Sequence, residues 1–293
     1  MRTIPAKTIV TRMKNNYWFG ADYNMNIYRG CCHGCIYCDS RSECYGNNAF
    51  DTVFAKEGAL QIVERELRGK RKKGVVATGA MSDPYNPFEE KELLTRGALA
   101  LLEKYRFGAA IATKSKLVAR DGDALKAIAK NAPVIVKVTV TTGDDSLCEK
   151  IEPHTPVASE RFAAVGELAE SGLFTGILLM PVLPFIEDTE ENIAGIVRQA
   201  ARHGARFVYP AMGVTLRDVQ RAYYYRKLDE LFPGLSDRYK RRYGGAYQCT
   251  SPLAKKLYGL LARECEKHGI VYRMRDIIEA YQAPYRQEQL SFL

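Results

Sequence analysis

The sequence lacks any long apolar run. None of its hydrophobic stretches approaches the roughly 20 residues that a membrane-spanning helix needs. The basic N-terminus, Met1–Met13, has no apolar segment followed by a small-residue cleavage site, so it does not resemble a signal peptide. We therefore expect a cytoplasmic protein without membrane association. With 46% hydrophobic and 26% charged residues, the chain has the composition of an ordinary soluble protein with a substantial core.

The evenly spaced cysteines of a disulfide-stapled secreted domain are also absent. Of the eight cysteines, four lie within Cys31–Cys38, and the others are scattered at Cys44, Cys148, Cys249 and Cys265. This distribution favours a reducing compartment. No internal repeat or low-complexity linker divides the 293 residues, a length that suits one large α/β domain with an appendage or two small domains.

From Asp22 to about Pro210, short β-rich runs alternate with longer segments of helical periodicity. That alternation predicts an α/β fold in which helices cover a parallel sheet. The predicted strands are Asp22–Tyr28, Val75–Gly79, Ala109–Thr113, Val134–Thr141, Thr175–Met180 and Arg206–Pro210. The predicted helices are Glu57–Arg68, Leu94–Tyr105, Asp121–Lys130, Pro156–Ser171 and Thr189–His203. Residues that directly follow the strands are candidate site residues, because active sites of parallel α/β folds lie at that edge.

Beyond Met212 the alternation stops, and the chain becomes basic and helical in periodicity. We divide the sequence into an N-terminal segment (1–21), a core (22–215) and a mainly helical C-terminal extension (216–293). Tyrosines of the extension are Tyr223–Tyr225, Tyr239, Tyr243, Tyr247 and Tyr258. Basic clusters are Lys70–Lys73, Arg238–Arg242, Lys255–Lys256, and Arg217, Arg221, Arg226 and Lys227. The net charge of +9 favours nucleic acid as a partner, with tyrosines that stack bases, although a solvated cationic surface also explains each cluster.

Cysteines follow the first predicted strand in a C-x3-C-x2-C spacing, at Cys31, Cys35 and Cys38. Gly30 and Gly34 allow a tight loop around an inorganic core. Ordinary four-iron clusters use four cysteine thiolates, so three leave one iron open to another ligand. The alternative is a zinc site that adds His33 or Cys32, but no second ligand pair follows downstream.

On this motif the chain resembles the radical S-adenosylmethionine (SAM) superfamily and, within it, the spore photoproduct lyase-like group. The resemblance implies a partial (β/α)6 TIM-type barrel with a helical C-terminal extension. It also implies two cofactors, a [4Fe-4S] cluster on the three cysteines and SAM chelated to the open iron. Reduction by a low-potential flavodoxin or ferredoxin then cleaves SAM to methionine and a 5′-deoxyadenosyl radical, which abstracts a substrate hydrogen. The protein supplies binding, orientation and exclusion of water.

Further site residues come from the same resemblance. Ser82 and Asp83, after the second strand, would receive the SAM ammonium, although such residues also form plain turns. Lys114, after the third strand, would reach the SAM carboxylate, since a lysine that ends an apolar strand needs an anion. On the fourth strand Lys137, Thr139 and Thr141 share one face; Thr139 is a candidate SAM ligand or a half-buried strand residue. The group pattern also includes Glu152 and Arg161, either as a buried pair or as a helix cap.

The resemblance weakens at the residues that return a hydrogen atom. The lyase carries a donor cysteine just before its Ser-Asp pair, where this chain reads Gly79-Ala80-Met81-Ser82-Asp83. Tyr37 matches a tyrosine inside the lyase cluster loop and is a candidate catalytic and cofactor-binding residue, but Asp39 replaces the second tyrosine. Photoproduct repair is therefore not expected. Cys249 is a candidate substitute donor or a small buried hydrophobe.

The chain ends in Gln289–Leu293, a sequence similar to the peptides by which bacterial DNA repair proteins bind the sliding clamp. Folding of this tail onto its own domain is the alternative. Together these features predict a monomeric radical SAM enzyme that acts on nucleic acid, in DNA repair or base modification. Radical SAM modification of a peptide or small molecule is a second reading, and a non-catalytic iron–sulfur sensing or binding module is a third.

Overall fold

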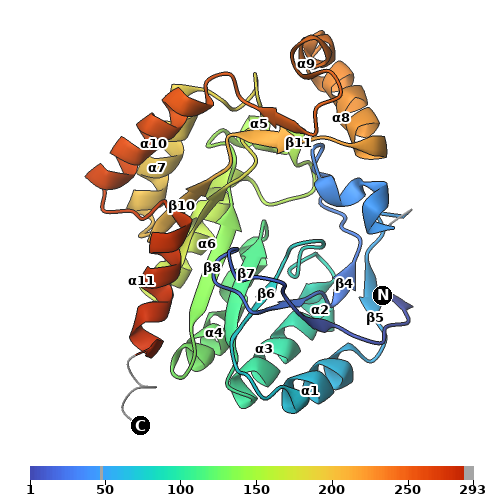
Figure 1. The fold of residues 1–293 in the computed structure, drawn as a ribbon, viewed down its shortest axis with the longest axis vertical. Helices are drawn as coiled ribbons and strands as arrows, with labels where there is room; N and C mark the ends of the chain where they lie inside the picture. The colour runs from blue at the N-terminus through green and yellow to red at the C-terminus, as the bar shows by residue number, and fades with distance from the viewer. Residues whose placement is uncertain (47–48, 287–293) are drawn as a thin grey trace.

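A seven-stranded sheet forms the centre of the computed structural model, which describes residues 1–46 and 49–286 (Figure 1). Its strands are ordered β10-β9-β8-β7-β6-β3-β2. The edge strand β2 (Val10–Arg12) pairs antiparallel with β3, whereas all other neighbours pair in parallel. The parallel strands are β3 (Tyr23–Met25), β6 (Val75–Thr78), β7 (Gly108–Thr113), β8 (Val134–Thr139), β9 (Thr175–Leu179) and β10 (Phe207–Pro210). These six coincide with the predicted strands, and the open sheet confirms the partial barrel.

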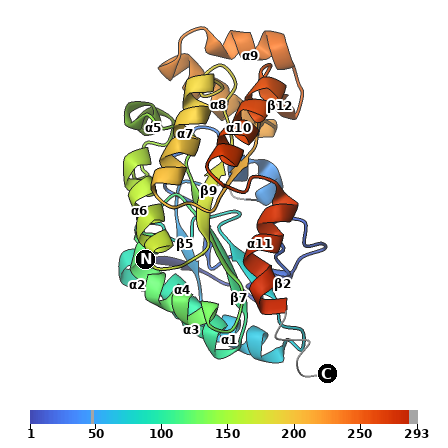
Figure 2. The same cartoon turned by 90° about the vertical axis from the view of Figure 1, so that its left-hand side faces the viewer.

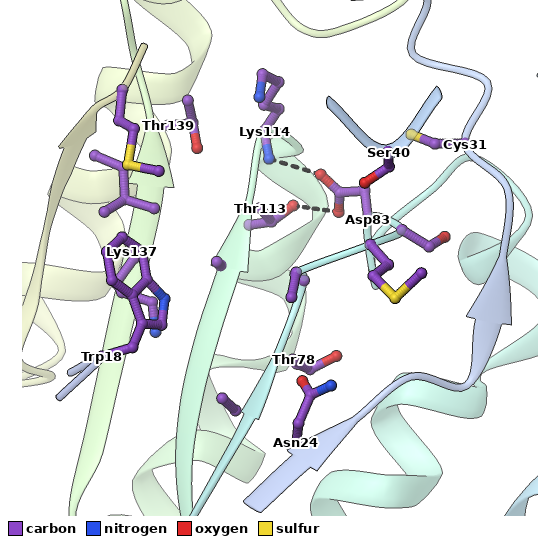
Figure 3. Close-up of a pocket in the computed structure, with 18 of the residues that line it drawn as sticks. Trp18, Asn24, Cys31, Ser40, Thr78, Asp83, Thr113, Lys114, Lys137 and Thr139 are labelled. Carbon is purple, nitrogen blue, oxygen red and sulfur yellow. Dashed lines mark hydrogen bonds between the residues drawn. The ribbon is translucent and has the colours of Figure 1, made fainter. Parts of the chain in front are cut away.

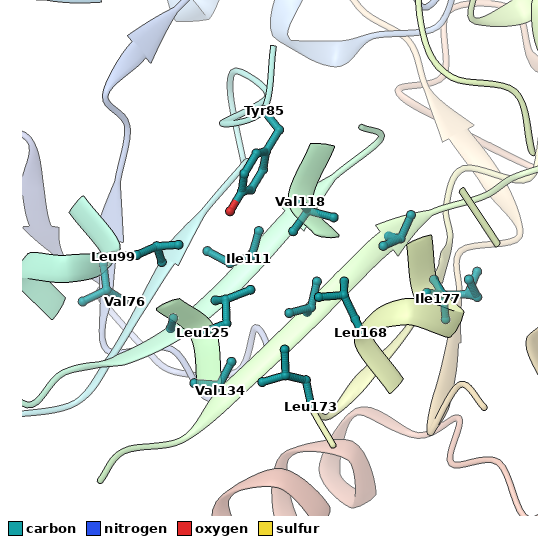
Figure 4. Packing of buried hydrophobic residues seen from close by; sticks show 14 of the residues in the cluster. Val76, Tyr85, Leu99, Ile111, Val118, Leu125, Val134, Leu168, Leu173 and Ile177 are labelled. Carbon is teal, nitrogen blue, oxygen red and sulfur yellow. The ribbon is translucent and has the colours of Figure 1, made fainter. Parts of the chain in front are cut away.

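Helices cover the outer face of this sheet, as the helical periodicity predicts. They are α1 (Ala59–Gly69), α3 (Leu94–Lys104), α4 (Gly122–Ala129), α6 (Ala158–Glu170) and α7 (Glu190–Arg202). Leu99 of α3, Leu125 of α4 and Leu168 of α6 pack with Val76, Ile111 and Val134 of the strands, as Figure 4 shows. This packing forms most of the large core. Each buried aliphatic side chain contributes about 1.5–3 kcal/mol to the free energy of folding.

The inner face of the sheet divides into an apolar base and a polar upper part. Successive strand residues point to opposite faces, so in β8 Val134, Val136 and Val138 belong to the outer core. Ile135 lies on the inner face, in an apolar cluster with Phe19 and with Ile277 of α11 (Met274–Arg286). Lys137 and Thr139 follow above it and line a cavity.

Residues of the N-terminal segment contribute one strand to the seven-stranded sheet and one strand to a second, three-stranded sheet. Besides β2, the segment forms β1 (Arg2–Ile4), which pairs with β5 (Phe54–Lys56) in a three-stranded sheet completed by β4 (Tyr28–Arg29). Short helices are α2 (Glu89–Glu92), α5 (Asp145–Ile151) and the 3-10 turns Asp39–Arg41, Glu43–Tyr45 and Lys116–Asp121. At the base of the seven-stranded sheet, α11 packs against the N-terminal segment.

The C-terminal part of the chain contains helices and one small antiparallel ribbon. Its helices are α8 (Asp218–Leu231), α9 (Leu235–Tyr243), α10 (Ala254–Lys267) and α11, and the ribbon pairs β11 (Gly213–Thr215) with β12 (Gln248–Thr250). Helix α10 lies alongside α7 (Figure 2). The predicted clamp peptide Gln289–Leu293 lies outside the described residues. None of the helices in the described part of the chain is long and apolar enough to cross a bilayer.

Candidate active site

A cavity of about 740 Å³ opens where the carboxyl ends of β6, β7 and β8 meet the cysteine loop. Figure 3 shows Cys31, Lys114 and Thr139 around its upper end, with Lys137 and Trp18 at the other. The side chains of Cys31, Cys35 and Cys38 all line it, together with Ser82, Asp83, Lys114 and Thr139. The structure therefore brings most of the predicted site residues to one place, as the rule on strand ends requires.

The cysteine loop is anchored by backbone contacts to neighbouring segments. Cys31 N–H donates to Phe50 O at 2.8 Å, and Ile36 N–H donates to Ile151 O at 3.0 Å. Gly30 has a φ of 78°, and a Cβ there would lie 2.0 Å from Thr52 O, so only glycine fits this close approach. The loop conformation is thus imposed by its surroundings.

The three thiols fit an iron–sulfur cluster better than a single metal ion. Among the described residues, no group of three or more His, Cys, Asp or Glu side chains is placed to hold one ion. Cys32, a possible fourth ligand in the zinc alternative, lines a different groove from the other three. Burial, with a smaller effect of Asp83, raises the pKa of Cys31 to about 12, so a cationic metal core must favour the thiolate that binds it.

Asp83 joins the loop after β6 to the end of β7. Its carboxylate accepts hydrogen bonds from Thr113 Oγ1 at 2.6 Å, from the backbone N–H of Lys114 at 2.7 Å and from that of Tyr85 at 2.9 Å. His33 Nδ1, within the cysteine loop, lies 3.5 Å from the same carboxylate. Because nearly all its acceptor positions are taken, Asp83 orients the wall of the cavity.

Ser82, beside it, contacts the cysteine loop. Ser82 Oγ donates to Gly30 O at 2.5 Å and so connects the loop after β6 with the loop that carries the thiols. Gly79 begins the loop after β6 and has a φ of 95°. A Cβ atom added at this position would lie only 1.9 Å from Ala112 O. The Ser-Asp turn therefore has a structural function in addition to its place on the cavity wall.

A buried charge network lies behind Lys114. Glu152 and Arg161 are both fully buried, and Arg161 Nη2 lies 2.5 Å from Glu152 Oε2. Lys114 Nζ is 3.9 Å from Glu152 Oε1, and the Tyr37 hydroxyl donates to the same oxygen. Burial favours the neutral acid, but Arg161 and Lys114 outweigh it and hold the pKa of Glu152 below its ordinary value. The buried-pair alternative for Glu152 and Arg161 is therefore the correct one.

Arg161 also braces the strand that carries Thr139. Its Nη1 donates to Thr139 O at 3.0 Å, and its Nε donates to Pro156 O at 2.7 Å. The Glu152–Arg161 pair thus positions two lining residues, Lys114 through charge and Thr139 through its backbone.

Two predicted catalytic residues are absent from the cavity wall. Cys249, in β12, is 0% exposed and packs in a second apolar cluster, with its thiol 3.7 Å from Ala246 O. Tyr37 belongs to that same cluster, with its hydroxyl on Glu152. These positions argue against Cys249 as a hydrogen donor to a ligand in the cavity and against direct contact of Tyr37 with such a ligand. Of the described cavity-lining residues, only the three motif cysteines carry thiols.

Two tyrosines of the C-terminal extension are structural. Tyr224 and Tyr239 are fully buried, hydrogen-bond to each other at 3.0 Å and are in edge contact at 5.4 Å. The expectation that these two stack on bases is wrong, because their amphipathic rings fill the core between α8 and α9. Tyr247 and Tyr258, at 45% and 43% exposed, remain accessible.

Sequence reasoning missed the far end of the cavity. Lys14, Asn15 and Trp18 of the N-terminal segment line it, as do Asn24 and Lys137. The segment before Asp22 contains no motif, and only the fold brings it across the inner face of the sheet. The alternation along the fourth strand had already placed Lys137 on the same face as Thr139, but without assigning it a function.

The family model of the radical SAM superfamily matches residues 25–200. The chain belongs to this superfamily. An uncharacterized protein of Mycobacterium tuberculosis is 30% identical over 244 residues, which cover 81% of this chain and 72% of that protein.

Two solved radical SAM enzymes share the fold. Spore photoproduct lyase, in a variant with bound AdoMet and dinucleoside spore photoproduct, has a TM-score of 0.65 and 16% identity over 90% of this chain and 78% of its own. The methyltransferase TsrM of Kitasatospora setae, with its tryptophan substrate, has a TM-score of 0.56 and 11% identity over 91% and 62%. The protein is therefore a radical SAM enzyme that uses a [4Fe-4S] cluster and SAM.

Proposed function

We propose that Cys31, Cys35 and Cys38 hold the cluster and that the enzyme abstracts a hydrogen atom from a nucleic acid substrate. The observation that carries the first part is that all three thiols line one cavity with the strand-end residues. Held by these cysteines and reduced by one electron from a flavodoxin or ferredoxin, the cluster would supply the electron for cleavage of SAM to methionine and a 5′-deoxyadenosyl radical, and that radical would take the substrate hydrogen to give 5′-deoxyadenosine.

The residues of the chain orient SAM. Lys114 binds the SAM carboxylate, since this residue lines the cysteine end of the cavity and the Glu152–Arg161 pair behind it orients its ammonium. Ser82, Asp83 and Thr139 border the same end, where Asp83 holds the wall through its hydrogen bonds and Thr139 offers a hydroxyl to the SAM carboxylate or ribose. Burial at this end excludes water from the radical step.

Charge supports nucleic acid as the substrate class. Lys14, Lys114 and Lys137 line the cavity, and Asp83 is the one carboxylate among its described lining residues. On the surface, Arg241 and Arg242 of α9 are exposed, and Arg217 lies 5.0 Å from the ring of the exposed Tyr247. Cations that track phosphates beside an accessible aromatic ring suit single-stranded nucleic acid. The fold neighbour with a bound dinucleoside ligand supports the same class.

Anaerobic reconstitution tests this function. With dithionite and SAM, the loaded enzyme is expected to form 5′-deoxyadenosine, and short DNA and RNA oligonucleotides are expected to bind at low salt. An intact cluster without 5′-deoxyadenosine would favour a sensing module. Radical formation without binding of any nucleic acid would favour a peptide or small-molecule substrate.

A further inference from the structure

Lys137 lies in the middle of β8 and has no polar partner among the described residues. Its side chain is 1% exposed, lines the cavity on the inner face, and makes neither a hydrogen bond nor an ion pair. Its ammonium lies over the ring of Phe19, 4.9 Å from the ring centroid. An ammonium so deeply buried without an acid is costly, because water is lost and no charge replaces it.

One neighbouring strand leaves space beside this side chain. In the ladder, Lys137 is opposite Ala112 of β7, whose small side chain lines the cavity, and Gly176 of β9, which the Phe207 ring covers. Thr139, two residues along the same face, lies ~7 Å nearer the cysteines. A ligand that reaches Lys137 therefore lies next to the end of the cavity assigned to SAM.

Trp18 lines the same end of the cavity as Lys137 (Figure 3), and the Phe19 ring contacts both side chains. Its ring is in edge contact with Phe19 at 5.0 Å and Tyr209 at 5.6 Å. Helix α11 holds the backbone of this loop, since Tyr281 OH donates to Phe19 O at 2.5 Å and Gln282 Nε2 donates to Gly20 O at 3.2 Å. Asn24 and Thr78 add polar groups on the opposite side.

We propose that Lys137 and Trp18 form the substrate subsite, which takes a planar ring bearing an exocyclic oxygen, as in an extruded nucleobase. Lys137 donates a hydrogen bond to the oxygen, Trp18 contacts the ring, and the small Ala112 side chain opposite Lys137 leaves room for it. This inference rests on the proposed function, of which it specifies the substrate chemistry. Enzymes that modify bases bind them outside the helical stack in such pockets.

Trp18 provides the measurement, because it is the single tryptophan of the chain. Thymidine 5′-monophosphate is titrated into the cluster-loaded enzyme while tryptophan emission is excited at the red edge of its absorption. Binding of a fluorescently labelled single-stranded thymidine oligonucleotide is followed separately by anisotropy. The variants are Lys137→Met and, as a matched control on the exposed face of α4, Lys126→Met. Inorganic phosphate alone tests for a simple anion site.

We expect both ligands to change Trp18 emission in the wild type and in Lys126→Met, and the Kd of the mononucleotide to rise about tenfold or more in Lys137→Met. Lys137→Met should remain folded, so lost binding reports the missing ammonium. Oligonucleotide binding without any change of Trp18 emission would overturn the subsite while the proposed function stands.

The remaining outcomes separate the two proposals further. A Lys137-dependent mononucleotide signal without oligonucleotide binding would support the subsite and overturn the polymer substrate. An equal response to phosphate alone would overturn recognition of the ring. Absence of both signals would overturn both proposals.

Discussion

The two ends of the cavity differ in how their polar groups are satisfied. At the cysteine end, Asp83 accepts hydrogen bonds from Thr113 and from two backbone amides, and Glu152 pairs with Arg161. At the far end, Lys137 has no such partner among the described residues, although it is equally buried. Fully satisfied networks fix geometry. The difference agrees with our proposal that one end is pre-organised for the cofactors and that a ligand completes the other.

The largest effect is expected from the cysteine end. Cys35→Ala removes one of the three proposed cluster ligands and should abolish formation of 5′-deoxyadenosine, because the described cavity lining holds no thiol besides those of the three motif cysteines. Iron and sulfide content and product formation are measured after anaerobic reconstitution. Cys32→Ala is the matched control and should retain both, since Cys32 lines another groove. Equal loss in the two variants would refute the assignment.

Breaking the buried pair should weaken folding next. Glu152→Gln leaves the Arg161 charge buried without its carboxylate, which costs about 3–5 kcal/mol in the free energy of unfolding. Urea unfolding measures the loss. Glu190→Gln removes an exposed partner of Lys256 and should cost less than about 1 kcal/mol. Similar costs for the two would show that the Glu152 network is not a stabilising feature.

A substitution at the far end of the cavity should instead raise the free energy of unfolding. Lys137→Met should raise the free energy of unfolding by about 1–3 kcal/mol, since an unpaired buried ammonium is replaced by an apolar chain. Burial lowers the pKa of Lys137 to about 7. Other titratable groups of the cavity lining are Lys14, Lys114, Asp83, His33 and the three cysteines.

The pH dependence of that gain follows from the lowered pKa. Below about pH 7, Lys137 is charged in both the folded and the unfolded chain, and the full cost of its buried charge lowers the free energy of unfolding. Between about pH 7 and the ordinary lysine pKa of 10.5, the unfolded chain binds more protons than the folded one, so wild-type stability rises with pH. The advantage of Lys137→Met should therefore be largest near pH 6 and decline towards pH 10. Thermal unfolding across this range checks it, and a pH-independent difference would contradict the lowered pKa.

The smallest effect is expected outside the cavity. Cys249→Ala leaves a small void in the second apolar cluster and should cost about 1 kcal/mol. SAM cleavage and substrate turnover should remain at wild-type rates, because the thiol does not line the cavity. Denaturation and 5′-deoxyadenosine assays measure the two quantities. Turnover lost at unchanged stability would restore Cys249 as the hydrogen donor.

Local patterns predicted the elements well. Alternation of apolar residues determines which face of a strand or helix is buried, and so it located all six parallel strands and their helices. Ser82, Asp83 and Lys114 were located by the family resemblance together with the rule that active sites lie where parallel strands end. The buried network of Glu152 was only half readable, because the sequence showed Glu152 and Arg161 without showing whether they meet.

By itself, the sequence determined the cysteine spacing, the alternating α/β core and the family resemblance, since each depends on residues that are close along the chain. Only the tertiary structure decided that Trp18 and Lys137, 119 positions apart, line one cavity, that Cys249 is enclosed, and that Tyr224 and Tyr239 fill a core. These relations depend on how distant segments pack, and a side chain acquires a cavity, a partner or a shield from water only when the sheet and its helices assemble.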